Sequence, residues 1–128
     1  LGVMGFAELL LRLRIPYDSE EALQKAREIM GFIRQEGHLA SRQLAEERGP
    51  FPNYPGSVWE QSGGAPIRNA TVTTVAPTGT ISILSGTSSG IEPLFAISFM
   101  RDVLEGTKLL EVNPLFEEAA VRARCFGP

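Results

Sequence analysis

The chain has 128 residues, within the size range of a single domain, and 43% of them are hydrophobic. Its formal net charge of −3 argues against a nucleic-acid partner, because binding a phosphate backbone requires clustered Lys and Arg, whereas here the basic residues alternate with acidic ones. No apolar run approaches the ~18 residues of a transmembrane helix, so no membrane partner is expected.

Residues 1–48 are expected to form two helices. Apolar residues recur at helical spacing over Leu1–Leu13, and Pro16 interrupts the pattern shortly afterwards. A second helix is predicted to begin at Asp18, which together with Glu21 has the spacing of a capping box. Its apolar positions continue to about Arg48, where a Gly-Pro pair ends the helix.

Residues 49–68 are rich in Gly, Pro, Asn and Ser and show no hydrophobic periodicity. We expect a long ordered loop, anchored by the aromatic side chains of Phe51, Tyr54 and Trp59. A flexible linker is the alternative, but three aromatic residues in so short a stretch are unusual for a solvated segment.

Residues 69–96 are predicted to contain a strand followed by a ligand-binding loop. Ala70–Ala76 is rich in β-branched residues and bounded by turn formers, which is typical of a strand. Pro77–Thr80 forms the turn, and Ile81–Leu84 opens a short helix. The small residues of Ser85–Gly90 then form a second loop.

Residues 97–128 are expected to contain a strand or helix and then a terminal helix. The apolar segment Leu94–Leu104 fits either kind of element. Asn113 and Pro114 are typical of a helix start and predict a last helix over Leu115–Arg124.

The turn after the predicted strand has the chemistry of an anion-binding site. Gly79 lets the backbone approach a ligand closely and adopt a positive φ if one is required. Hydroxyl groups on both sides of Gly79, and the first N–H groups of the following helix, can donate to phosphate oxygens. An ordinary turn without a ligand remains the alternative. The candidate phosphate-binding residues are Pro77, Thr78, Gly79, Thr80, Ile81 and Ser82.

A family resemblance adds a ligand to this site. The run RNATVTTVAPTGTISILSGTSSGIEPLFA (Arg68–Ala96) resembles the catalytic large chain of ribonucleotide reductase, in particular the adenosylcobalamin-dependent class. The segments LGVMGFAELLLRLRIPYDSEEA and EVNPLFEEAA extend the resemblance over nearly the whole chain. The di-iron-dependent class tends to carry Glu at the position of Gly79. The resemblance implies an α/β fold, namely a helix-rich fragment of a ten-stranded α/β barrel with one or two strands. It also implies that the turn binds the diphosphate of a ribonucleotide substrate.

The resemblance further implies that residues 1–128 form one segment of a larger catalytic barrel. In this family the radical Cys and a Glu lie in an Asn-Pro-Cys-Gly-Glu stretch that has no counterpart here, and the reducing Cys pairs are also absent. We therefore expect an inactive isolated chain, with adenosylcobalamin in the parent enzyme and no cofactor bound by this segment alone. The expected partners are the substrate and the rest of the reductase chain, with self-association of the segment as a further expectation. A stand-alone phosphate-binding or assembly module without catalysis is the alternative.

The remaining polar residues are expected to have structural roles. Cys125 is the only cysteine and His38 the only histidine, so neither an internal disulfide nor a Cys/His zinc site is expected, and no residue is assigned to catalysis or metal binding. The absence of a disulfide fits a cytoplasmic location. Glu92 follows the second loop and is suited to orient it by accepting backbone N–H bonds, but a structural role as a capping or salt-bridging residue is favoured. Asn69 is expected to be a turn residue.

Overall fold

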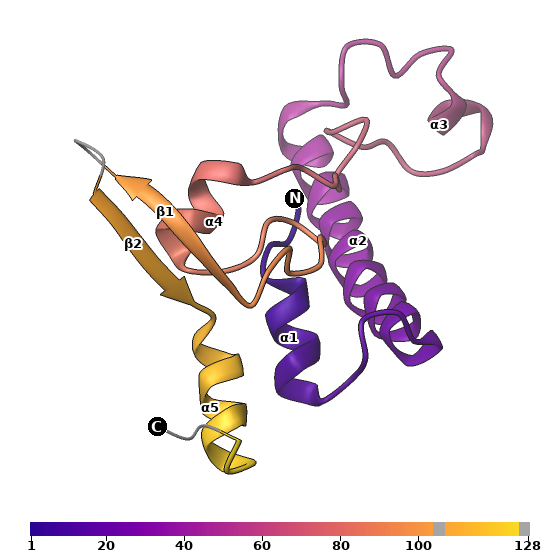
Figure 1. The fold of residues 1–128 in the computed structure, drawn as a ribbon. Coiled ribbons are helices and arrows are strands. Elements are labelled where there is room, and N and C mark those ends of the chain that lie inside the picture. The colour runs from indigo at the N-terminus through magenta and orange to yellow at the C-terminus, as the bar shows by residue number, and fades with distance from the viewer. Residues whose placement is uncertain (104–106, 126–128) are drawn as a thin grey trace. The chain divides into compact units, whose positions relative to one another are not determined.

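The computed structural model describes residues 1–103 and 107–125. Contacts within the chain divide it into two compact units. The first unit comprises Leu1–Val3 and Ser19–Ala76, and the second comprises Met4–Asp18 and Pro77–Pro128. The described residues contain five helices and two strands: α1 (Phe6–Leu13), α2 (Glu20–Arg48), α3 (Val58–Gln61), α4 (Gly79–Ser85), β1 (Ser98–Val103), β2 (Thr107–Val112) and α5 (Pro114–Arg122) (Figure 1).

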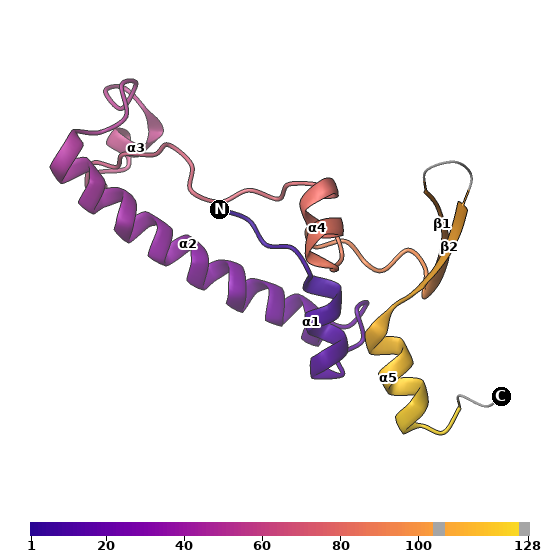
Figure 2. The ribbon, with the colours of Figure 1, turned by 90° about the vertical axis from the view of Figure 1, so that its left-hand side faces the viewer.

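The first unit is built on α2, one long helix in both views (Figures 1 and 2). Its N-cap is Ser19, whose hydroxyl accepts a hydrogen bond from Ala22 N at 3.1 Å, so the prediction of Asp18 as the capping residue was wrong by one position. The helix ends as predicted at Arg48, where Gly49 adopts a φ of 75° that a residue with a side chain rarely tolerates.

The loop over residues 49–68 is held by its aromatic side chains, as expected. Tyr54 is buried, and its hydroxyl donates to the carbonyl of Gly64 at 3.1 Å. The rings of Phe51 and Tyr54 meet edge to face, and Trp59 Nε1 donates to the carbonyl of Ala70 at 3.0 Å. The short helix α3, which was not predicted, lies within this loop near the C-terminal end of α2 (Figures 1 and 2).

The predicted strand over Ala70–Ala76 is not formed. A strand requires a hydrogen-bonded neighbour along its length, and within the described residues the backbone of this segment forms hydrogen bonds with the backbone of Leu1 alone. The nitrogen of Leu1 donates to the carbonyl of Val72 at 2.7 Å, and Thr74 N donates to the carbonyl of Leu1 at 2.8 Å. The β-branched residues therefore predicted an extended conformation without supplying the partner that defines a strand.

The second unit has its core on one face of α1. Phe6, Ala7, Leu10 and Ile15 are buried there. The helix begins at Phe6, several residues later than predicted, because Gly5 precedes it in the left-handed region with a φ of 77°.

The chain then forms a hairpin after α4. β1 and β2 pair antiparallel, with Ser98 opposite Val112 and Val103 opposite Thr107. The predicted strand or helix over Leu94–Leu104 is thus a strand from Ser98, and its last position lies outside the described residues. The second strand was not predicted. Within the described part of the chain, β1 and β2 form one two-stranded sheet, which does not close into the expected barrel.

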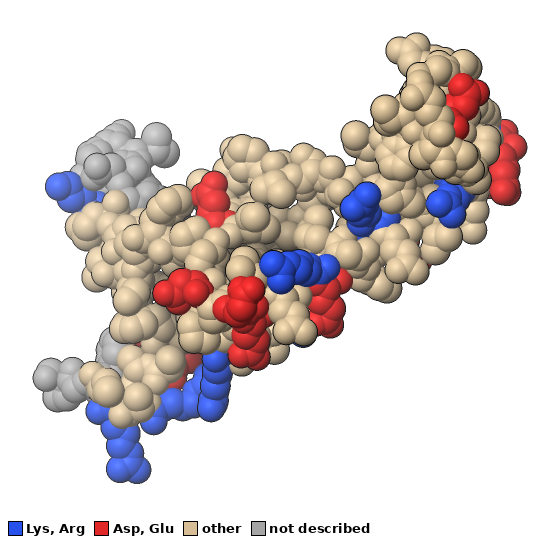
Figure 3. Space-filling model, turned by 90° about the vertical axis from the view of Figure 1, so that its right-hand side faces the viewer, with Lys and Arg blue, Asp and Glu red and all other residues tan. Residues whose placement is uncertain are grey.

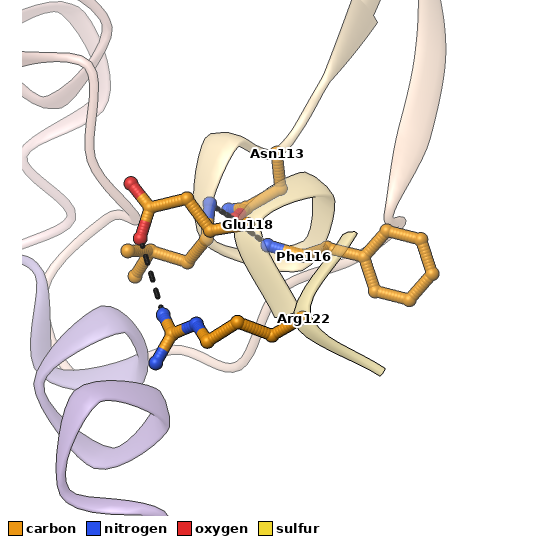
Figure 4. A network of polar contacts seen from close by, with 5 residues as sticks. Asn113, Phe116, Glu118 and Arg122 are labelled. Carbon is orange, nitrogen blue, oxygen red and sulfur yellow. Dashed lines mark hydrogen bonds and ion pairs between the residues drawn. The ribbon is translucent and has the colours of Figure 1, made fainter. Parts of the chain in front are cut away.

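The terminal helix α5 begins where the sequence predicted. The Asn113 side chain accepts hydrogen bonds from Leu115 N at 3.0 Å and Phe116 N at 3.2 Å, and Pro114 occupies the first helical position (Figure 4). Glu118 and Arg122 form an exposed ion pair one turn apart. Local capping signals were therefore sufficient to locate this helix.

Charged side chains of both signs are interspersed on the face shown in Figure 3, separated by larger uncharged areas. Of the helices in the described ranges, none combines the length and the apolar character needed to cross a bilayer.

Candidate phosphate-binding turn

The turn before α4 has an unusual backbone at Thr78. This residue is the N-cap of α4 and adopts φ 51° and ψ 28°, in the left-handed region that β-branched residues rarely occupy. Two hydrogen bonds fix it there: Gly90 N donates to Thr78 Oγ1 at 2.7 Å, and Ser82 N donates to the Thr78 carbonyl at 2.8 Å. The sequence had offered Gly79 as the residue able to take a positive φ, and the structure gives that conformation to its neighbour.

Gly79 itself faces open space. A Cβ built on it would meet no atom within 4 Å. Neither packing nor backbone conformation therefore requires glycine here, and the surface above this residue is accessible to a ligand.

Three backbone N–H groups of the turn are available for an anion. The first hydrogen bond of α4 is donated by Ser82 N, so the N–H groups of Gly79, Thr80 and Ile81 have no acceptor within the described part of the chain. The hydroxyl of Thr80 is exposed and is likewise without a described partner. Three amides and one hydroxyl of exposed residues in one short segment are thus without a described partner.

The other two predicted hydroxyls stabilise the turn. Ser82 is 2% exposed, and its Oγ donates to the carbonyl of Gly79 at 2.8 Å. Because a hydroxyl has one proton, Ser89 Oγ is the donor in the 2.9 Å contact between the two serines. Thr78 Oγ1 accepts from Gly90 N, as described above. Of the three hydroxyls, only that of Thr80 remains available to solvent.

The second small-residue loop is bound on its other side by a residue that sequence reasoning missed. The Glu8 carboxylate, from α1, accepts hydrogen bonds from Ser88 N at 2.9 Å, Ser88 Oγ at 2.6 Å and Thr87 Oγ1 at 3.1 Å. Burial alone would raise the pKa of Glu8, but the hydrogen bonds from Ser88 and Thr87 outweigh it and hold the pKa below its ordinary value. Glu8 is therefore ionised at neutral pH and acts only as an acceptor.

Glu92 does not have the role that the sequence indicated. Its backbone N donates to the carbonyl of Ser89 at 2.9 Å, but its carboxylate accepts no hydrogen bond from any described residue. Glu8 is the carboxylate that orients the loop. The one available sequence signal was that Glu8 is the single acidic residue of α1, a helix whose other charged residue is Arg12. Asn69 instead pairs with Ser41 of α2, donating from its backbone N to Ser41 Oγ at 2.9 Å.

The lone histidine and the lone cysteine have no described partner that would activate them. The ring of His38 packs against Trp59 with centroids 5.2 Å apart, as expected of a packing residue, and Cys125 is exposed. No cluster of three metal-binding side chains occurs among residues 1–103 and 107–125. A cavity of about 650 Å³ lies in the first unit between α2 and the loop after it, and none of the six turn residues lines it.

Comparison with known proteins identifies the family. The family profile for the barrel domain of ribonucleotide reductase matches residues 1–65 and 60–125. A vitamin B12-dependent ribonucleoside-diphosphate reductase of Thermoplasma acidophilum is 61% identical over 92% of this chain and 15% of its own length. A protein of the same name from Mycobacterium tuberculosis is 59% identical over 94% of this chain and 17% of its own.

A solved structure supports the same assignment. The alpha subunit of a class Id ribonucleotide reductase from Actinobacillus ureae matches with a TM-score of 0.67 and 26% identity, over 97% of this chain and 20% of that subunit. The chain thus spans between one seventh and one fifth of the length of these relatives. The profile match and the high identity confirm the resemblance seen in the motifs: the chain belongs to the ribonucleotide reductase family.

Proposed function

We propose that these 128 residues act as part of an enzyme that reduces ribonucleoside diphosphates to deoxyribonucleotides, and that residues 77–82 hold the diphosphate of the substrate. The observation that carries the proposal is the set of three amides and one hydroxyl without a described partner at the exposed residues Gly79, Thr80 and Ile81. It occurs in a chain that is 61% identical to a relative named as a ribonucleoside-diphosphate reductase.

The physical basis is hydrogen bonding to a charged acceptor. Backbone N–H groups that lack a partner are available to phosphate oxygens at no cost in broken internal bonds, and successive amides around a tight turn form a concave anion site. In this arrangement Thr80 and the amides contact the diphosphate. Pro77 restricts the entry to the turn, while Thr78 and Ser82 hold its shape through their internal hydrogen bonds.

We propose that the parent enzyme uses adenosylcobalamin, which would generate the radical that starts ribose reduction, because relatives 59–61% identical are named as vitamin B12-dependent. The residues of this segment do not fit a corrinoid site. Its one imidazole, that of His38, is packed on the ring of Trp59. We therefore propose that the cofactor is bound by other parts of the parent enzyme and not by this segment.

The partner that we propose is the rest of the reductase chain. Large apolar side chains are exposed in both units, among them Phe32, Leu84 and Phe95. Exposed apolar residues in such number are typical of a surface that packs against further protein, and a second copy of the segment is the alternative partner. The cytoplasm is the proposed location, because a reductase that depends on thiol pairs requires a reducing compartment.

The 128 residues alone are expected to give no turnover. Ribose reduction in this family requires a thiyl radical and a reducing cysteine pair, and Cys125 is the only cysteine present. The measurement is formation of deoxynucleotide by the purified segment with ribonucleoside diphosphate, adenosylcobalamin and a dithiol. Product above the level of a reaction without protein would contradict the proposal.

Removing the Thr80 hydroxyl tests the phosphate site directly. In the reductase chain that contains this segment, Thr80→Val is expected to weaken nucleoside diphosphate binding by about ten- to a hundredfold, because a hydrogen bond to a charged group contributes ~1.5–3 kcal/mol. The fold is expected to be unchanged, since this hydroxyl makes no hydrogen bond to described residues. Dissociation constants from calorimetry provide the measurement.

Two variants serve as controls. Thr80→Ser keeps the hydroxyl and should bind like the unmodified protein, and Thr71→Val removes an exposed hydroxyl outside the turn. Equal diphosphate affinity in Thr80→Val and Thr71→Val would remove Thr80 from the proposed site.

A further inference from the structure

We propose that Glu8 is a positioning residue for the substrate phosphates, acting through the loop over residues 87–90 to hold the turn over residues 77–82. The inference rests on the proposed function of that turn. It assigns to α1 a part in substrate binding, although no residue of α1 belongs to the turn itself.

The first half of the connection joins α1 to the loop. The Glu8 carboxylate accepts three hydrogen bonds, two from Ser88 and one from Thr87. In the opposite sense, Gly5 N donates to the carbonyl of Ser88 at 2.9 Å. Ser88 is buried, and both its backbone N–H and its carbonyl are satisfied by residues at the start of α1.

The second half joins the loop to the turn. Thr87 N donates to the carbonyl of Ser82 at 3.0 Å, Ser89 Oγ bonds to Ser82 Oγ at 2.9 Å, and Gly90 N donates to Thr78 Oγ1 at 2.7 Å. Each contact ends on Thr78 or Ser82, the two residues whose internal bonds set the turn. The last of them stabilises the left-handed conformation of Thr78, the N-cap residue that directly precedes the unpaired amides.

The loop over residues 87–90 is therefore hydrogen-bonded to Glu8 on one side and to the turn over residues 77–82 on the other. An ionised carboxylate is suited to the position of Glu8. Only a carboxylate can accept from an amide and two hydroxyls at once without donating a proton. Loss of that acceptor leaves the N–H of buried Ser88 unpaired, which is costly enough for the loop to move. Movement of the loop releases Thr78 and Ser82, so the geometry of the amides at Gly79, Thr80 and Ile81 is lost with it.

The test compares Glu8→Ala and Glu8→Gln in the reductase chain that contains the segment. Glu8→Ala is expected to raise KM for the nucleoside diphosphate about tenfold or more, with a much smaller change in kcat. Binding of the corresponding nucleoside without phosphates, as competitor, should be unchanged. Glu8→Gln should lie in between, because its amide oxygen still accepts from Ser88 N and its amide N–H groups can donate to the two hydroxyls. Glu36→Ala, an exposed α2 glutamate without described partners, is the matched control and should match the unmodified protein.

The outcomes separate this inference from the proposed function. An unchanged KM in Glu8→Ala, together with weaker diphosphate binding in Thr80→Val, overturns the role of Glu8 and leaves the phosphate turn in place. Unchanged diphosphate binding in both variants overturns both. An equal loss of nucleoside and nucleoside diphosphate binding shows a general structural effect and also overturns the positioning role. Should Glu8→Ala fail to fold, as judged by circular dichroism, Glu8→Gln decides by the same criteria.

Discussion

Replacing Leu10 by alanine is expected to lower the free energy of unfolding of the second unit by about 2–5 kcal/mol, the range for a leucine truncated in a packed core. Leu10 is 1% exposed and lies among Phe6, Ala7 and Ile15, which form the small core on α1. Because this core is small, neighbouring side chains have little freedom to close the cavity that truncation leaves. Urea unfolding followed by circular dichroism measures the effect.

The same helix supplies the control for this prediction. Leu11 and Leu13 are each 48% exposed, so truncating either should cost less than ~1 kcal/mol. The three leucines share similar helical backbone and the same chemistry, and they differ in burial. Equal destabilisation by Leu10→Ala and Leu11→Ala would show that α1 does not pack as described here.

The contrast between α5 and the predicted strand shows what the sequence could determine. The start of α5 depends on Asn113 and Pro114, which lie next to the helix that they cap, so the signal and its effect are both local. Ala70–Ala76 has the composition of a strand, but strand formation depends on a partner elsewhere in the chain, which composition does not encode. The hairpin of β1 and β2 was missed for the same reason, since pairing is decided between segments.

The candidate site shows the same division. Its location followed from the Thr and Gly residues of one short turn, and its ligand from a family resemblance. The internal use of the Thr78 and Ser82 hydroxyls could not be predicted, because it depends on a loop anchored by Glu8, which is 80 positions away from Ser88 in the sequence. Each of these hydroxyls could equally have faced a ligand, and only the tertiary contacts distinguish the two cases.

Adding a single methyl group at Gly5 should test the anchor of that loop without replacing any of its hydrogen-bonding side chains. Gly5 has a φ of 77°, and a Cβ there would lie 2.5 Å from Thr87 Oγ1. Thr87 is a short side chain bonded to Glu8, so it cannot move aside without losing that bond. Gly5→Ala is therefore expected to destabilise the second unit by about 1–3 kcal/mol, from backbone strain and displacement of the loop together.

Gly31→Ala is expected to have the opposite effect. A Cβ on this α2 residue meets nothing within 4 Å, so the smaller loss of backbone entropy on folding should stabilise the helix by ~0.5–1 kcal/mol. Urea midpoints of the two variants should shift in opposite directions, and a midpoint that does not fall in Gly5→Ala would show that Thr87 does not lie against Gly5.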